Sequence, residues 1–153
     1  MIDFDQYFHK TQIERLSFQT RKQNGNYGHD IIFLSSYLHD ATFLRRDLVL
    51  KAGVIELEVN RDCWELYKLN STTTNWLPGC RSRLRFSDVF RLKLPGSTPK
   101  EFMIGSVFIG SKSYRRDDYC ELIIISQCLN FEIVIKARED TIPVTLEDLE
   151  DPK

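Results

Sequence analysis

Two adjacent histidine–aspartate pairs, His29-Asp30 and His39-Asp40, are the residues of this chain whose types best suit chemistry. Imidazole and carboxylate groups bind metal ions, and they also act as general acids and bases. Both pairs border the apolar run DIIFLSSYL at 30–38, which we interpret as a strand. Neighbouring residues of a strand point to opposite faces, so a consecutive His and Asp do not converge on one ion. We therefore interpret YLHDA as a turn, in which Asp40 accepts backbone N–H bonds and His39 donates to a nearby carbonyl.

A cleft that brought together His39, Asp40 and Trp64 is the alternative site, for a small ligand or a substrate. Trp64 stands beside Cys63 in the stretch RDCWEL, and a cysteine becomes a nucleophile when a neighbouring base lowers the pKa of its thiol. No residue adjoining Cys63 is suited to do so, and a tryptophan in a β domain is typically a core anchor. We assign no catalytic residue, no metal and no cofactor from the sequence.

Basic residues recur at alternate positions of the segment 81–94, RSRLRFSDVFRLKL. They share one face of a strand and could hold a phosphate, a carboxylate or an acidic protein surface: Arg81, Arg83, Arg85, Arg91 and Lys93. Glu56 and Glu58 have the same spacing on another segment, and cross-strand ion pairs would stabilise the sheet by about 0.2–1 kcal/mol each. We favour this pairing. Where the arginines are not paired, they form the best interaction surface that the sequence offers.

The hydrophobic pattern has a period close to two over most of the chain. Only residues 3–12, with apolar side chains at helical spacing, predict a helix. Strands are predicted at 30–38, 53–59, 63–69, 81–94, 101–110, 119–126 and 131–137. The segment 101–110 is apolar on both faces, as in a central strand that is covered from two sides, and the last two strands form a hairpin.

Within 81–94 the apolar face is expected to consist of Leu84, Phe86, Phe90, Leu92 and Leu94. Ser87-Asp88 interrupts this alternation, so we predict a bulge or a turn that divides the segment.

These elements predict a mainly β fold: an antiparallel β-sandwich or partly open barrel of about 7–8 strands with a short N-terminal helix. We expect a single domain over 1–153, with a helix or edge segment at 1–20, a β core at 30–137 and an acidic, partly disordered tail at 140–153. A chain of 153 residues buries about 70% of the surface that its unfolded form exposes, so it can form such a core unaided.

Composition and charge limit the class of partner. The net charge of −1 gives no overall field that would attract nucleic acid or an anionic membrane. The acidic start MIDFDQYF has neither the basic nor the apolar segment of a secretory signal, so we expect a cytoplasmic protein. Its cysteines, which lack CxxC spacing, are then expected to be reduced thiols of the core: Cys63, Cys80, Cys120 and Cys128.

The sequence therefore favours a small non-enzymatic domain that binds a protein partner, of a regulatory or immunity-like kind. The contact would use an exposed strand edge or the charged faces of 54–60 and 81–93. Homodimerisation through an edge strand is a further expectation. Two alternatives stay open: an enzyme or small-molecule binder near His39, Asp40 and Trp64, and weak RNA or single-stranded DNA binding through the Arg81–Lys93 strand.

Overall fold

The computed structural model describes residues 15–19, 22–23, 26–27, 30–63, 79–94, 96, 99–110, 120–126, 132–137 and 142–150. Several sequence predictions fall outside these residues: the helix over 3–12, nearly all of the strand over 63–69, and the side chains of His29, Trp64 and Cys128.

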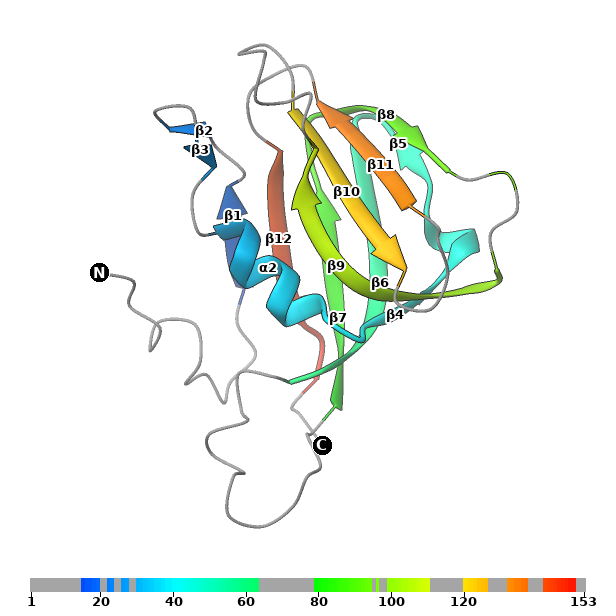
Figure 1. Ribbon diagram of the computed structural model, residues 1–153. Coiled ribbons are helices and arrows are strands. Elements are labelled where there is room, and N and C mark those ends of the chain that lie inside the picture. Colours follow the sequence, from blue (N-terminus) through cyan, green and yellow to red (C-terminus); the bar gives the residue numbers. More distant parts are fainter. Residues whose placement is uncertain are drawn as a thin grey trace.

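One antiparallel sheet of ten strands makes up most of the described chain (Figure 1). Its members are β1 (Arg15–Gln19), β4 (Thr42–Leu44), β5 (Leu50–Lys51), β6 (Val54–Asp62), β7 (Gly79–Phe86), β8 (Val89–Lys93), β9 (Glu101–Ile109), β10 (Cys120–Ser126), β11 (Glu132–Ala137) and β12 (Pro143–Asp148). The spatial order is β1-β12-β7-β6-β4-β9-β10-β11-β8, and β5 pairs with β6. The predicted class, a mainly β antiparallel sheet with a short helix, is confirmed.

The sheet curls until its last strand returns to the turn between β5 and β6. At that point the backbone N–H of Val89 donates to the carbonyl of Gly53 at 2.9 Å. The turn itself has two residues with positive φ, Ala52 at 51° and Gly53 at 77°, as tight antiparallel hairpins require. The sheet is not closed, and this arrangement is consistent with either predicted architecture, a sandwich or a partly open barrel. The smaller described elements are β2 (Lys22–Gln23), β3 (Asn26–Tyr27) and a 3₁₀ turn, η1 (Arg45–Asp47).

The helix α2 (Asp30–Leu38) occupies the segment for which we expected a strand, and this expectation is wrong. Its buried side chains are Phe33, Leu34, Tyr37 and Leu38, which recur with the spacing of one helical face. The helix contacts β1, β6 and β9, and the ring centroids of Tyr37 and Phe18 of β1 are 5.9 Å apart. α2 therefore packs on the inner side of the sheet and contributes to the core.

Strand β9 is central, as predicted, but only one of its faces is covered. Met103 and Phe108 point outward and are 39% and 37% exposed. The apolar pattern on both faces arises because the strand contains a bulge: Ile125 lies opposite Ser106, whereas the next residue, Ser126, lies opposite Ile104. Gly105 is the extra residue, and the buried positions change from even to odd numbers across it.

The segment 81–94 divides at Ser87-Asp88, as predicted, and Asp88 has a positive φ of 58°. The two halves are not neighbours, because β7 pairs with β6 and β12 while β8 pairs with β11 at the far edge. The turn also breaks the alternation. Phe90, expected on the buried face, is 41% exposed.

The segment 140–153, for which we expected a partly disordered tail, contains the strand β12 over Pro143–Asp148. β12 lies between β1 and β7 with Val144 and Leu146 buried. The stretch PVTLED alternates between apolar and other residues, but it ends in acidic residues, and we interpreted it together with them as a charged tail.

Candidate functional site

The His39-Asp40 pair forms the turn that leads from α2 to β4, and this turn is hydrogen-bonded to β9. Asp40 has a positive φ of 65°, and its backbone N–H donates to the carbonyl of Ile104 at 2.9 Å. His39 Nδ1 lies 2.9 Å from the carbonyl oxygen of Gly105, to which the imidazole donates. The interpretation of this stretch as a turn agrees with the structure, but the turn follows a helix and the carbonyl acceptor is 66 positions away in sequence.

α2 takes the place of a strand beside the second half of β9. Strand β4 pairs only with the first three residues of β9, Glu101–Met103. Ile104 still exchanges backbone hydrogen bonds with Asp40 and Ala41. Beyond it, side chains of α2 and of the turn that follows bond to the backbone edge of β9. The hydroxyl oxygen of Ser35 accepts the N–H of Val107 at 3.0 Å, and His39 serves the carbonyl of Gly105. Side chains thus satisfy polar backbone groups that a neighbouring strand would otherwise pair.

An open groove of about 340 Å³ runs between α2 and β9. Its lining is mostly apolar, with two hydroxyls and one imidazole: Ile31, Ile32, Ser35, Ser36, His39, Gly105, Val107 and Phe108. Two of these apolar side chains are strongly exposed, Ile32 at 61% and Phe108 at 37%. We call this feature the α2–β9 groove. No sequence signal identified it, because the prediction of a strand at 30–38 left no helix to form its wall.

A second hollow, of about 330 Å³, has a polar lining. Its residues are Asp40, Thr42, Asn60, Arg61, Asp62, Gly79, Cys80, Arg81 and Glu150. His39 and Asp40 therefore line different hollows, although His39 Nε2 and Asp40 Oδ1 are 3.7 Å apart. Burial raises the pKa of Asp62, the charge of Asp40 raises it further, and His39 partly offsets both effects.

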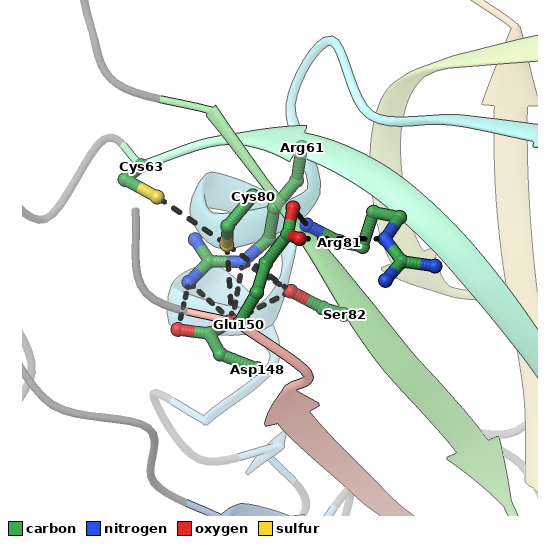
Figure 2. A network of polar contacts seen from close by, with 7 residues as sticks. All are labelled: Arg61, Cys63, Cys80, Arg81, Ser82, Asp148 and Glu150. Carbon is green, nitrogen blue, oxygen red and sulfur yellow. Dashed lines mark hydrogen bonds and ion pairs between the residues drawn. The ribbon is translucent and has the colours of Figure 1, made fainter. Parts of the chain in front are cut away.

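The polar hollow overlies a buried ion pair between Arg61 and Asp148 (Figure 2). Nη2 of Arg61 donates to both carboxylate oxygens of Asp148, at 2.9 and 3.0 Å, and the Ser82 hydroxyl donates to the same carboxylate at 2.6 Å. The guanidinium also lies over the ring of Tyr37, 5.6 Å from its centroid. This network ties α2, β6, β7 and β12 together.

We did not predict this network from the sequence, although the strand pattern contains a signal for it. In β6 the buried positions are Ile55, Leu57, Val59 and Arg61, so a charged residue continues an inward-facing series. Ser82 occupies an equivalent buried position in β7. A charge at an inward position of an alternating strand requires a buried partner.

Two thiols adjoin the network. The S–H of Cys63 donates to the sulfur of Cys80 at 3.5 Å, and the Cys80 thiol lies 3.3 Å from Oδ1 of Asp148. The hydrogen bond from Cys63 and the charge of Arg61 lower the pKa of Cys80, against the opposing effects of burial and of Asp148. Cys63, Cys80 and Cys120 are buried and are not joined in a disulfide.

The arginines of β7 form the cross-strand ion pairs that we favoured. Arg81 lies 2.9 Å from Glu58, while Arg83 and Arg85 lie 3.8 and 3.5 Å from Glu56. Arg91 and Lys93 are exposed on β8, apart from this ladder, and have no ion pair within the described part of the chain. The basic face is therefore divided between two distant strands, and its larger part is neutralised.

Across the described residues, no three His, Cys, Asp or Glu side chains are grouped so that they could hold a metal ion. The helical part of the described chain has no segment with the length and apolar character needed to cross a membrane. Comparisons with protein-family models, with curated proteins and with solved structures found no match to this chain.

Proposed function

We propose that this protein is a non-enzymatic binding module that holds an extended segment of a partner protein in the α2–β9 groove. The observation that carries the proposal is the backbone edge of β9 from Gly105 to Ile109. No described strand lies beside this edge, and exposed Ile32 and Phe108 border it. A peptide that adds to such an edge gains affinity from main-chain hydrogen bonds and specificity from alternate side chains.

The side chains that now bond to β9 can make way for an incoming strand. The Ser35 hydroxyl and the His39 ring can leave the edge of β9 by rotation about their side-chain bonds. Backbone donors and acceptors of the peptide would then bond to β9 at similar distances. Each exchange substitutes one hydrogen bond for another, so its net cost is small. The favourable free energy would then come from burying Ile32 and Phe108, whose side chains are exposed in the unbound chain.

The lining indicates the chemistry of the partner. Among the described residues that line the groove, His39 is the only ionisable side chain, and aliphatic and aromatic side chains predominate. We therefore propose an uncharged, β-forming segment with apolar residues at alternate positions, because a charged segment would lose hydration without gaining a counter-charge. The three described cysteines are reduced, which suits a cytoplasmic location, and we include that location in the proposal.

Other readings of the site have less support. An acidic partner surface or a nucleic acid would need a cluster of unpaired cations. Arg81, Arg83 and Arg85 already contact glutamates, so the basic face keeps only Arg91 and Lys93 for such a partner. A catalytic site built on His39 and Asp40 would need both side chains in one cleft, and they line separate hollows.

The experiment begins with selection of binding segments from a random peptide library displayed on phage, using the purified full chain as bait. The dissociation constant of a selected peptide is then measured with wild-type protein and with Ile32→Glu. Ile32 is 61% exposed, so the substitution should leave folding intact. We expect about 30-fold weaker binding, because a charge in a hot spot costs about 2 kcal/mol or more.

Val49→Glu is the matched control. Val49 is also aliphatic and 56% exposed, but it does not line the groove, so the same charge there should leave affinity unchanged. Equal weakening by both substitutions would indicate a nonspecific effect of charge. Full affinity in Ile32→Glu would show that peptides bind elsewhere and would contradict the proposal.

A further inference from the structure

Cys63 and Cys80 form a pair of thiols on one face of the sheet. Cys80 lies opposite Arg61 in the register of β6 and β7, and Cys63 follows Arg61 by two residues, so the two thiols point to the same side. Their sulfur atoms are 3.5 Å apart (Figure 2). A disulfide requires about 2.0 Å, so a small displacement of either side chain would bring the two sulfurs to bonding distance.

The polar hollow gives one of these thiols a route to solvent. Cys80 is 5% exposed and lines the hollow together with Arg61, Asp62 and Arg81. Cys63 is fully buried behind it. Cys120 is also fully buried, but it belongs to the apolar core and lines neither hollow. A small polar oxidant would therefore meet Cys80 first.

The surroundings of Cys80 favour its thiolate, which is the nucleophilic form of cysteine. The hydrogen bond from Cys63 and the positive charge of Arg61 lower the pKa of Cys80, and this outweighs the opposing effects of burial and Asp148. The contact with the Ser82 hydroxyl, 3.5 Å from the sulfur, also lowers the pKa of Cys80.

We infer that Cys63 and Cys80 are a redox-modification site at which hydrogen peroxide converts the two thiols into a disulfide. In the first step the thiolate of Cys80 attacks the terminal oxygen of the peroxide and the O–O bond breaks. The leaving hydroxide takes up a proton and departs as water, which leaves a sulfenic acid on Cys80. In the second step Cys63 attacks this sulfur. The S–O bond breaks, and the hydroxyl leaves together with the proton of the Cys63 thiol as a second molecule of water. The two sulfurs lose two electrons, which reduce the peroxide.

The sequence allows a direct test by peptide mapping of the full chain. After treatment with hydrogen peroxide, the remaining thiols are alkylated and the protein is digested with trypsin without reduction. Cleavage after Arg61, Lys68 and Arg81 should release DCWELYK joined to LNSTTTNWLPGCR, with two hydrogen atoms lost. Cys120 and Cys128 share a separate peptide, DDYCELIIISQCLNFEIVIK, and serve as internal controls.

We expect the linked peptide to form about tenfold faster than Cys120 is oxidised within the control peptide, because thiolate character and access both favour Cys80 over Cys120. The disulfide should also raise the midpoint of thermal unfolding by about 5 °C, since it constrains the unfolded chain. Oxidation of all thiols at one rate, or alkylation of both Cys63 and Cys80 after peroxide treatment, would overturn the inference.

Single variants test the order of the two steps. In Cys63→Ser, Cys80 should stop at the sulfenic acid, which dimedone traps. In Cys80→Ser, Cys63 should stay unlabelled, because it lies behind Cys80. Equal dimedone labelling in both variants would contradict the assignment of Cys80 as the attacking thiol. The wild-type peptide map tests the site independently of whether either variant folds.

Discussion

Replacement of Asp148 by asparagine would test the role assigned to the buried network. The side chains of Arg61 and Asp148 are only 2% and 12% exposed, and the bidentate contact places Nη2 within 2.9 Å of Oδ1. Asparagine has nearly the same shape as aspartate and keeps one oxygen that accepts a hydrogen bond. The variant therefore removes the charge of Asp148 with little change in packing, and the buried guanidinium of Arg61 loses this counter-charge.

The magnitude follows from that loss. Removing one partner of a buried ion pair typically costs about 3–5 kcal/mol, and the retained oxygen of asparagine places this variant near the lower value, about 3 kcal/mol. Domains are stable by only about 5–15 kcal/mol, so this is a large fraction of the total. With a urea m-value of about 2 kcal/mol per molar, the unfolding midpoint should fall by about 1.5 M at unchanged m.

Glu58→Gln provides a control at the same atomic separation. Arg81 and Glu58 also approach to 2.9 Å, but their side chains are 51% and 48% exposed. Solvent screens such a pair, so its loss should cost less than about 1 kcal/mol. Urea unfolding followed by circular dichroism compares the two variants. If Asp148→Asn destabilised the protein no more than Glu58→Gln, burial would not control the strength of these contacts and the reasoning would be refuted.

Three further perturbations have defined outcomes. Asp40→Asn should lower the pKa of Asp62 toward its ordinary value, measured by carboxyl-carbon NMR titration; an unchanged pKa would exclude the charge of Asp40 as a cause. Because the pKa of Asp62 is higher in the folded state than in the unfolded state, the protein loses stability as pH rises through the folded-state pKa. Asp40→Asn should make this loss of stability smaller. Ser35→Ala should cost about 1 kcal/mol and accelerate hydrogen exchange at the Val107 amide, whose acceptor it removes; unaltered exchange would contradict the contact. Ala52→Asn should raise the melting temperature, since Ala52 has a φ of 51° and asparagine tolerates that region better by up to about 1 kcal/mol; a lower melting temperature would oppose this account.

The sheet could be predicted where local alternation and burial coincide. In 53–59 the side chains of Ile55, Leu57 and Val59 are buried while Glu56 and Glu58 are exposed, as the pattern indicated. The hairpin of β10 and β11 was likewise predicted, and Leu122 pairs with Ile135. In these segments the local alternation and the pairing with one neighbouring strand are enough to determine which side chains are buried.

Prediction failed where tertiary contacts decide between local alternatives. The run DIIFLSSYL is apolar and nine residues long, which is compatible with a short helix or a buried strand. The helix is favoured in the folded chain because it packs against β9 and because Ser35 and His39 satisfy the backbone of that strand. Those partners lie 72 and 66 positions away, so the local sequence contains no trace of them.

The candidate site depends on the same long-range contacts. We chose His39 as a candidate because Asp40 follows it in the sequence. Its hydrogen-bond partner in the structure is instead the carbonyl of Gly105, in the bulge of β9. The α2–β9 groove exists only because β4 ends after three residues and a helix follows the remaining edge of β9. The alternation of apolar residues in a strand does not reveal which part of its edge lacks a neighbouring strand.

The most direct test of the proposed function is amide hydrogen exchange of β9 with and without a saturating selected peptide. Strand addition in the α2–β9 groove predicts at least about tenfold slower exchange within Gly105–Ile109, at the amides directed toward the groove, because the peptide would compete with solvent for them. It also predicts unchanged exchange in β6 and β7, which lie outside the groove. Protection confined to another strand, or peptide binding without any protection in Gly105–Ile109, would contradict the proposal.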